Sequence, residues 1–545
     1  MKAAARLGQW CVEKLGADYT QWRVLTRVML KTDFRSASAL QMGNSPAREG
    51  AGTQWMSLLL YGAFGLYGVA VAVVLPDLFL AAVWSLSMMG LVVAMVILID
   101  YGSVVISPTD YEILAHQPVS SRTYFLVKLT NVLLYAGMIG ALVTGPTWIF
   151  LGVRHGLITA VVFPVIAAAA ITWTALAIVS VYAWLVRVVR PARFDRILSY
   201  IQVLLVTAVV AAPLLLGELE DRLEAVEIGT SPALFALPAA WFASALPLVN
   251  GEWSVTGVLA VLTAAGSTVC LFYIVSRRLS LSYAERMGAL LTASASDRSR
   301  VSPMRSARRR FPVEVRAVAT LLRGHFRHDR NFRMAVLSIL PMTLLYVYLS
   351  LREGSLPDPF VNLGFEASRL WTIHFVVIGG PQMLLESLFR SESFRAGWIF
   401  FASPVDRAKL VTGAGHCIAL FVLLPYLTIL GGVFVWAFGD VLHAGAHAVV
   451  LGLVSNLAVQ VRLLLAPRLP FSEPPAKGGF SVGVFSAMVV SGVLIGLLPL
   501  ALGAAYAGTA ATIATIVVLV LANAAAPRLV ARRIAPRLQR LEFAG

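Results

Sequence analysis

Long apolar runs dominate this chain: between residues 55 and 525, about twelve of them alternate with short polar connections. A run of about 20 apolar residues can cross a bilayer core as a helix, because lipid offers no partners to free backbone N–H and C=O groups. With 58% hydrophobic and 13% charged residues, the chain has too little polar surface for a water-soluble protein of this length. The sequence therefore predicts an all-α polytopic membrane protein.

The apolar runs fall into two sets of six, separated by a long polar interval. The predicted spans are roughly 55–75, 79–99, 129–151, 157–186, 197–217 and 254–276 in the first set, and roughly 334–351, 370–388, 410–437, 443–464, 481–503 and 507–525 in the second. We therefore divide the chain into a first half at 1–276, a basic linker with a surface helix at 277–333, and a second half at 334–545.

The distribution of Lys and Arg orients these spans. All but four of the 44 Lys and Arg residues lie in segments that an even number of spans places on the side of the N-terminus; the exceptions are Arg154, Arg222, Arg352 and Arg369. Because basic residues are retained in the cytoplasm, we expect a multi-pass protein of the cytoplasmic (cell) membrane with both termini inside. The net charge of +16 then indicates contact with anionic lipid of the bilayer, and we expect no nucleic-acid partner.

The two halves resemble each other. Each begins with an amphipathic segment, at 20–36 and 315–327, with basic residues on one face and apolar residues on the other. We expect both to form helices on the cytoplasmic membrane surface, with their apolar rows in lipid. Each half continues with two spans, a polar segment with a Pro-Val step (Pro118-Val119 and Pro404-Val405), and four more spans. The matching order indicates a duplication, and six spans per half make it a parallel repeat.

The sequence carries no familiar catalytic or nucleotide-binding motif. It has no G-x-x-x-x-G-K-[ST] loop to hold the phosphates of ATP and no H-E-x-x-H metal motif. We therefore predict a protein that is not an enzyme, with no cofactor and no metal of its own. His443 and His447 are spaced for one helix face, but they fall in a predicted external loop, and we interpret them as ordinary polar residues.

Ionisable residues are scarce within the predicted spans. Glu386 and Arg462 lie close to the cytoplasmic ends, where long side chains can reach the aqueous interface. His374 and His416 lie deeper, and we expect a helix–helix hydrogen bond for each. Ion-driven transporters normally bind their coupling ion with charged groups inside the membrane, so this scarcity favours another energy source.

The polar segments after the second and eighth spans are the most informative. The first reads Asp110-Tyr-Glu-Ile-Leu-Ala-His-Gln-Pro-Val-Ser-Ser-Arg122, and the second extends from Glu392 to Lys409. Each places charged and apolar residues on a short helix, then a proline that ends it, then a basic residue before the next span. Apolar side chains in so short a segment must be shielded from water, either by neighbouring helix ends or by a soluble partner protein.

This order of surface helix, two spans, helix-Pro-Val loop and four spans resembles the transmembrane permease subunit of type-two ATP-binding-cassette (ABC) exporters. The resemblance covers nearly the whole chain, once per half. In that family the loop after the second span carries a coupling helix that fits a cleft in the ATPase subunit. The resemblance therefore implies two fused six-span halves and a separate ABC ATP-binding subunit, in two copies, as the partner.

By the same resemblance, the residues that contact the ATPases lie in these two polar segments. They are Asp110, Glu112, His116, Pro118 and Arg122 in the first segment, and Glu392, Arg395, Trp398, Pro404, Asp406 and Arg407 in the second. The family also places short helices in the outer leaflet between its last two spans. Residues 218–253 could form them in the first half, whereas only Ala504 to Gly508 separates the last two spans of the second half.

Two other functions stay open. An ion-coupled secondary transporter would need charged residues at mid-membrane. A membrane enzyme acting on a lipid-linked substrate would need an acidic residue in the first external loop, where Asp77 lies, but we expect Asp77 to cap the following helix. The long apolar faces favour an amphiphilic cargo for a transporter.

Overall fold

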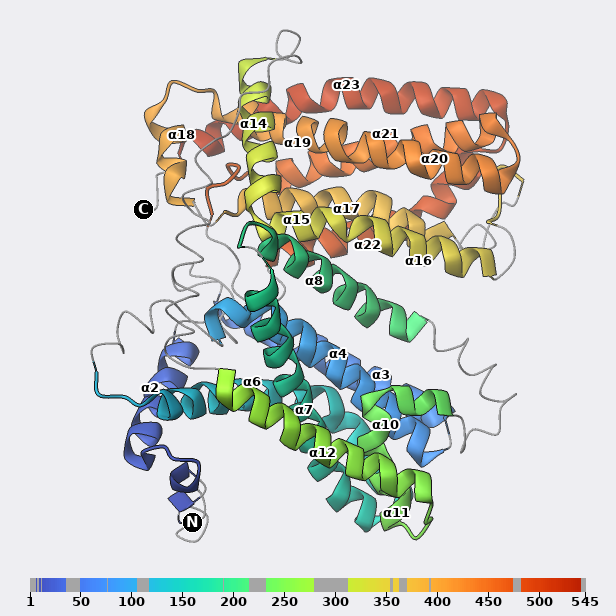
Figure 1. The fold of residues 1–545 in the computed structure, drawn as a ribbon. Coiled ribbons are helices and arrows are strands. Elements are labelled where there is room, and N and C mark those ends of the chain that lie inside the picture. Colours follow the sequence, from blue (N-terminus) through green and yellow to red (C-terminus); the bar gives the residue numbers. More distant parts are fainter. Residues whose placement is uncertain are drawn as a thin grey trace. The chain divides into compact units, whose positions relative to one another are not determined.

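The fold is known from a computed structural model, which describes residues 6, 9–10, 12–35, 50–75, 77–104, 117–189, 191–214, 232–278, 312–352, 356–361, 370–391, 394–473 and 482–540. The described residues form two compact units, one up to residue 278 and one from residue 312 onward. Both are helical, and the described part of the chain has no β-strand, only an isolated bridge between Arg390 and Glu473. The predicted all-α class is confirmed (Figure 1).

The first unit combines a surface helix with a bundle of long helices. Their bounds are α2 Tyr19–Arg35, α3 Gly50–Val74, α4 Leu78–Val104, α6 Ser121–His155, α7 Leu157–Val188, α8 Pro191–Leu214 and α12 Val255–Arg278. Three short helices precede α12: η2 Pro232–Ala236, α10 Pro238–Ala243 and α11 Ala245–Val249. Short helices are therefore present where the family resemblance implied them.

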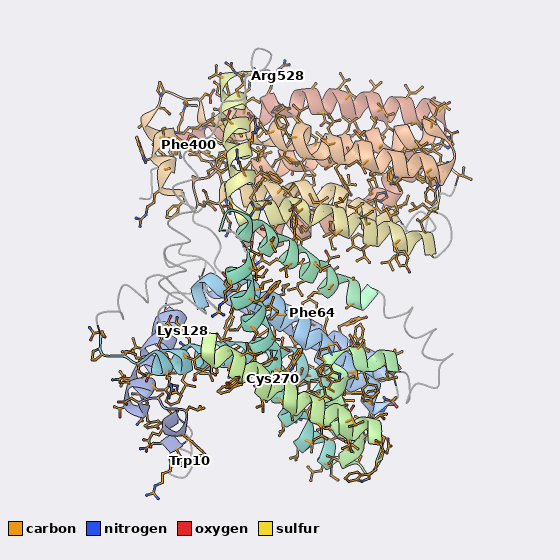
Figure 2. The ribbon with its side chains drawn as sticks, in the orientation of Figure 1. Trp10, Phe64, Lys128, Cys270, Phe400 and Arg528 are labelled. Carbon is orange, nitrogen blue, oxygen red and sulfur yellow. The ribbon has the colours of Figure 1, made fainter. Side chains whose placement is uncertain are left out.

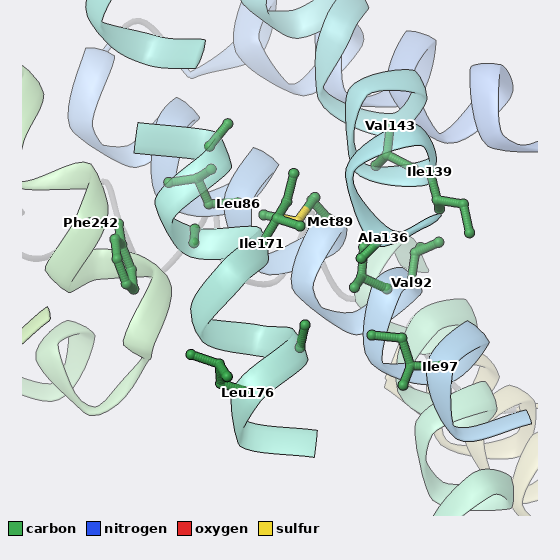
Figure 3. Close-up of a cluster of buried hydrophobic side chains, with 14 of the residues drawn as sticks. Leu86, Met89, Val92, Ile97, Ala136, Ile139, Val143, Ile171, Leu176 and Phe242 are labelled. Atoms are coloured by element: carbon green, nitrogen blue, oxygen red, sulfur yellow. The ribbon is translucent and has the colours of Figure 1, made fainter. Parts of the chain in front are cut away.

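Helix α4 lies at the centre of the first unit. It packs against α6, α7 and α8, and α12 packs against α7. Leu86 and Met89 of α4 share one hydrophobic cluster with Ile171 of α7 (Figure 3). Helices α3 and α6 approach closely at Gly65, where a Cβ would lie 2.8 Å from the carbonyl oxygen of Leu142. Such contacts through small residues are typical of helices in lipid, where close backbone packing stabilises association.

The second unit begins with a surface helix and continues with a second bundle. Its helices are α14 Val313–His328, α15 Arg330–Leu337, α16 Ile339–Arg352, α17 Trp371–Phe389, η4 Phe394–Trp398, α18 Ile399–Ala402, α19 Arg407–Ile418, α20 Leu424–Phe438, α21 Val441–Leu465, α22 Val482–Ala505 and α23 Thr509–Gln539. A π-helical turn, η5 Ala419–Leu423, joins α19 directly to α20.

Several helices of the second unit have neighbours in the same order as helices of the first, whereas, among the described helices, the close packing of α3 on α6 and of α23 on α19 is found in one unit alone. Helix α17 packs against α19, α21 and α22, and α21 packs against α23. In the first unit α4 packs against α6, α7 and α8, and α7 packs against α12. The surface helices also correspond, since α2 packs against α6 and α14 packs against α19.

The hydrophobic core of the second unit divides into two clusters along the bundle. On α17, Ile378 belongs to one cluster and Leu384 to the other. Between them lies Gln382, whose side-chain amide donates a hydrogen bond to Ser491 Oγ at 3.0 Å. A polar contact between α17 and α22 therefore lies between the two hydrophobic clusters.

An apolar helix overlaps each predicted span, although the apolar stretch described in four of these helices is too short by itself to count as membrane-crossing. Within the described residues, eight helices are long and apolar enough to cross a membrane. Shorter apolar helices at Tyr61–Val74, Ile197–Ala212, Ile373–Phe389 and Ser491–Ala505 fall on the other four predicted spans. These helices support the prediction of a multi-pass membrane protein.

The surface helices contact their own bundles more closely than we predicted. In α14, Val318 and Leu322 are buried in the core of the second unit, so this apolar row faces protein where we expected lipid. The reason is that α19 runs beside α14 and covers that face. In α2, Trp22 Nε1 donates a hydrogen bond to Thr130 Oγ1 of α6 at 3.1 Å. Each surface helix is thus held against the helix that follows a Pro-Val step.

His325, near the end of α14, makes the junction with α15 sensitive to pH. Its ring is buried against Phe332 and Phe471, and its Nε2 lies 3.6 Å from Asp329 Oδ2. Burial lowers the pKa of His325, and the Asp329 carboxylate opposes this shift only in part. The folded chain therefore holds a neutral imidazole at a pH where the unfolded chain takes up a proton.

We expect the folded chain to lose stability as the pH falls through about 6.5 and below, by up to about 1.4 kcal/mol per pH unit from this residue. His325→Phe keeps the ring packing and removes the proton, so its thermal unfolding midpoint should change less between pH 7 and pH 5. The exposed His416, replaced by Phe, is the control. An equal pH dependence in wild type and His325→Phe would contradict this account.

Candidate docking site

The segment from Phe394 to Arg407, which we call the docking segment, connects α17 to α19. It contains η4 and α18, and α18 ends two residues before Pro404. Asp406 then begins α19, because its carboxylate accepts hydrogen bonds from the backbone N–H groups of Ala408 and Lys409 at 3.0 and 3.3 Å. Figure 1 shows α18 beyond the end of the bundle, and Figure 2 labels Phe400 on it. The predicted short helix followed by proline is therefore present.

The docking segment exposes large apolar side chains. Trp398 and Ile399 are 54% and 52% exposed, and Arg395, Pro404 and Asp406 are exposed around them. The segment is too short to cross a membrane, and its flanks are charged. Neighbouring apolar residues with a polar rim are typical of a surface that binds another protein.

The base of the docking segment is held firmly. The Arg407 guanidinium lies 4.4 Å from the centre of the Phe401 ring and donates a hydrogen bond to the carbonyl of Leu538 on α23 at 3.0 Å. The family resemblance assigns Arg407 to the ATPase contact, and the structure gives it a structural role as well. Gly397 is buried against the backbone of Ser472, so η4 lies directly on the chain that follows α21.

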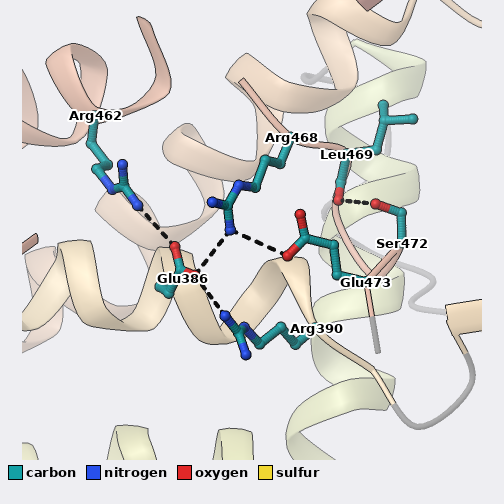
Figure 4. Close-up of polar contacts among 7 residues, drawn as sticks. All are labelled: Glu386, Arg390, Arg462, Arg468, Leu469, Ser472 and Glu473. Atoms are coloured by element: carbon teal, nitrogen blue, oxygen red, sulfur yellow. Dashed lines mark hydrogen bonds and ion pairs between the residues drawn. The ribbon is translucent and has the colours of Figure 1, made fainter. Parts of the chain in front are cut away.

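A buried ionic network lies where α17 ends. The Glu386 carboxylate contacts Arg390, Arg462 and Arg468 at 3.2, 3.0 and 3.1 Å, and Arg468 also contacts Glu473 at 3.2 Å (Figure 4). The side chains of Glu386 and Arg462 are only 2% and 5% exposed. The sequence predicts that both side chains reach the aqueous interface. The structure corrects this, because three arginines surround the carboxylate and replace its hydration.

Backbone hydrogen bonds complete this junction. The amide of Ser391 donates to the carbonyl of Glu473 at 2.9 Å, and the amide of Glu473 donates to the carbonyl of Phe389 at 3.0 Å. The end of α17 is thus joined to the chain after α21 by main-chain bonds as well as by charge. The docking segment starts from this junction, so a force on it acts on both α17 and α21.

The predicted segment of the first unit is described only in part. Asp110, Glu112 and His116 lie outside the described residues, as does Glu392 of the second unit. Ser120 caps α6 by accepting a hydrogen bond from Thr123 N at 3.1 Å.

The remaining two predicted residues of this segment are described. Pro118 is exposed, and its carbonyl accepts a hydrogen bond from the Gln21 side chain of α2 at 3.2 Å. Arg122 is exposed and its guanidinium lies against Gly16. Both are therefore placed at the contact between α6 and the chain around α2.

The histidines of the second unit differ from our interpretation. His443 and His447 lie in α21 and not in a loop, and His447 is fully buried. His447 Nε2 is 3.4 Å from His374 Nε2 of α17, which is the interhelical contact expected for His374. His416 instead contacts the carbonyl of Thr412 in its own helix at 2.8 Å. In the described part of the chain, no three His, Cys, Asp or Glu side chains form a group that could hold a metal ion.

Sequence reasoning missed the Glu386 network and the partner of His374. A signal was present in the sequence, since α17 and α21 each carry at least one histidine and one charged residue among mostly apolar residues. Asp77 behaves as predicted: its Oδ1 accepts a hydrogen bond from the amide of Leu80 at 2.8 Å, at the start of α4. In comparisons with known proteins, no family model, no curated protein and no solved structure matches this chain.

Proposed function

We propose that this chain is the membrane-spanning permease of an ABC exporter, with twelve spans arranged as two parallel six-helix repeats and both termini in the cytoplasm. ATP would be hydrolysed by separate ABC ATP-binding subunits, one for each half of the permease. The cargo class that the apolar helices favour is amphiphilic.

The observation that carries this proposal is the docking segment. It presents Trp398 and Ile399 to solvent while Arg407 and the Glu386 network hold its base. An exposed aromatic side chain on a firmly held segment suits an ATPase subunit, which must bind the permease and also move it. The segment also lies where basic residues gather, which is the predicted cytoplasmic side.

The matching neighbours in the two units support the proposed repeat. In each unit the surface helix packs against the helix that follows the Pro-Val step, α6 or α19. Ser120 caps the first of these helices and Asp406 caps the second. Two equivalent junctions would give each ATPase its own place on the permease.

The mechanism follows from the connections of the docking segment. When the ATPase subunits close on ATP, they would move this segment together with the end of α17. The contact of Glu386 with Arg462 would carry the movement to α21. Packed helices change position as rigid bodies between two arrangements, so the bundle would switch between inward and outward states.

Labelling from the two sides of the membrane tests the proposed spans. In a variant without the three native cysteines, we expect Cys at Arg395 or Pro404 to react with an impermeant maleimide only from the cytoplasm. Cys at Trp253 or Leu442, positions that are 80% and 81% exposed, should react only from outside. Reaction of position 253 from the cytoplasm would contradict the span count and the repeat together.

An ion-coupled transporter is the second candidate function. The observation in its favour is the buried contact of His374 with His447, since titratable groups inside a bundle are what such transporters use. It explains the docking segment less well, because a transporter driven by an ion gradient needs no soluble partner.

A further inference from the structure

Two histidines face each other inside the bundle of the second unit. His374 of α17 and His447 of α21 are 3% and 0% exposed, and their Nε2 atoms are 3.4 Å apart. A neutral imidazole carries one N–H and one bare nitrogen, so a neutral pair can place one proton between these two atoms. At 3.4 Å that contact is longer than an ordinary hydrogen bond, which leaves the bare nitrogen weakly satisfied.

The hydroxyl of Tyr506 can hydrogen-bond to His447 whether that ring is neutral or protonated. Its hydroxyl lies 2.9 Å from His447 Nδ1. A tyrosine hydroxyl can donate to a bare nitrogen or accept from an N–H, so it can reverse its role when the ring gains a proton. The rings of Phe434 and Phe438 on α20 contact His447 and keep it in this orientation.

A chain of contacts leads from this pair to a charged group near the surface. The Phe360 ring stacks on Tyr506 and on His443, with ring centres 4.0 and 4.4 Å apart. His443 Nδ1 is 2.6 Å from Asp358 Oδ2, and the His443 side chain is 35% exposed. The carboxylate of Asp358 therefore offers a negative charge at the end of the bundle where the pair is buried.

The other titratable groups around the pair are phenols. Tyr346 of α16 and Tyr426 of α20 border the same hydrophobic cluster, and Tyr426 hydrogen-bonds Thr343 at 2.8 Å. A phenol near pKa 10 stays neutral across the range in which histidine titrates. As the pH falls, the histidines are therefore the first groups of this cluster to take up a proton.

We propose that the His374–His447 pair is a proton-binding site: His447 takes one proton from water at Nδ1, and the Nε2–H already between the rings then holds the charged His447 against the bare Nε2 of His374. The new Nδ1–H donates to Tyr506, whose hydroxyl turns from donor to acceptor, and no other bond changes. Because the two rings lie on different helices, proton binding depends on the packing of α17 against α21. The corresponding helices of the first unit, α4 and α7, contain no histidine, so the site makes the two units unequal.

Nitrogen NMR of the full chain in lipid nanodiscs, labelled with ¹⁵N-histidine, tests the site directly, because the chain has only eight histidines. His374→Gln and His447→Gln assign the two rings, Tyr506→Phe removes the hydroxyl, and His416→Gln is the control. As the pH is lowered from 8 towards the pH at which the chain unfolds, we expect the signals of both rings to change at one common pH, with uptake of about one proton by the pair. His416→Gln should leave that transition unchanged, and Tyr506→Phe should move it.

The titration of the wild-type chain tests the proposed proton-binding site even where a variant fails to fold. Two rings that change at clearly separate pH values would overturn the shared site. So would two rings that keep their neutral signals down to the pH at which the chain unfolds.

Discussion

Replacing Glu386 by Gln is expected to lower the free energy of unfolding of the second unit by about 3–5 kcal/mol. Glu386 is buried, and its carboxylate contacts Arg390, Arg462 and Arg468. Glutamine keeps the shape but removes the negative charge, so three positive charges would face each other where water is largely excluded. Removing one partner of a buried ionic contact costs far more than losing a contact at the surface.

Glu473→Gln is the matched control for this prediction. Glu473 contacts Arg468 at 3.2 Å, but its side chain is 35% exposed, so the same chemical change should cost about 0.2–1 kcal/mol. Denaturant titrations of the detergent-solubilised chain, followed by tryptophan fluorescence, compare the two. If Glu386→Gln were no more destabilising than Glu473→Gln, the network would not hold α17 to α21.

The sequence predicts the class and the positions of the apolar helices well. Runs of apolar residues fix where helices lie, because lipid leaves the backbone no other solution. Local chemistry is equally accessible from sequence: Asp77 caps α4 and Asp406 begins α19, since capping depends on neighbours two or three residues away. The short helix before Pro404 follows from the same kind of local rule.

Contacts between distant helices could not be predicted in this way. Glu386 meets Arg462 and His374 meets His447 only because α17 and α21 lie side by side, and no local pattern encodes that neighbour. The sequence places Glu386 and Arg462 near the ends of their spans and predicts an interhelical hydrogen bond for His374, but it names no partner for any of them. The burial of Val318 in α14 was missed for the same reason, since its amphipathic pattern fits a lipid surface and a protein surface equally.

Trp398→Ala is expected to be the most damaging single change in the docking segment for partner binding. Trp398 is 54% exposed, so the substitution should cost the fold no more than about 0.5 kcal/mol. If the side chain is the anchor of an ATPase contact, the association should weaken by roughly 2 kcal/mol, or about 30-fold in Kd. Titration of the purified ATPase subunit against the permease in nanodiscs measures this change.

Trp253→Ala provides a control with the same substitution at another exposed tryptophan. Trp253 is 80% exposed and precedes α12, on the predicted outer side. Its replacement should leave the association unchanged. Equal affinity of the wild type and of Trp398→Ala for the ATPase would show that the docking segment is not the anchor.

The claim that the docking segment binds an ABC ATPase is tested most directly by photocrosslinking in the native membrane. A photoreactive amino acid at Ile399, which is 52% exposed, should form an adduct with an ABC ATP-binding subunit, whereas the same group at Leu442 should not. Mass spectrometry of the adduct identifies the protein. An adduct of position 399 with an ATP-binding subunit is the result that the proposed function predicts, and adducts of position 399 with lipid or with this chain alone would contradict it.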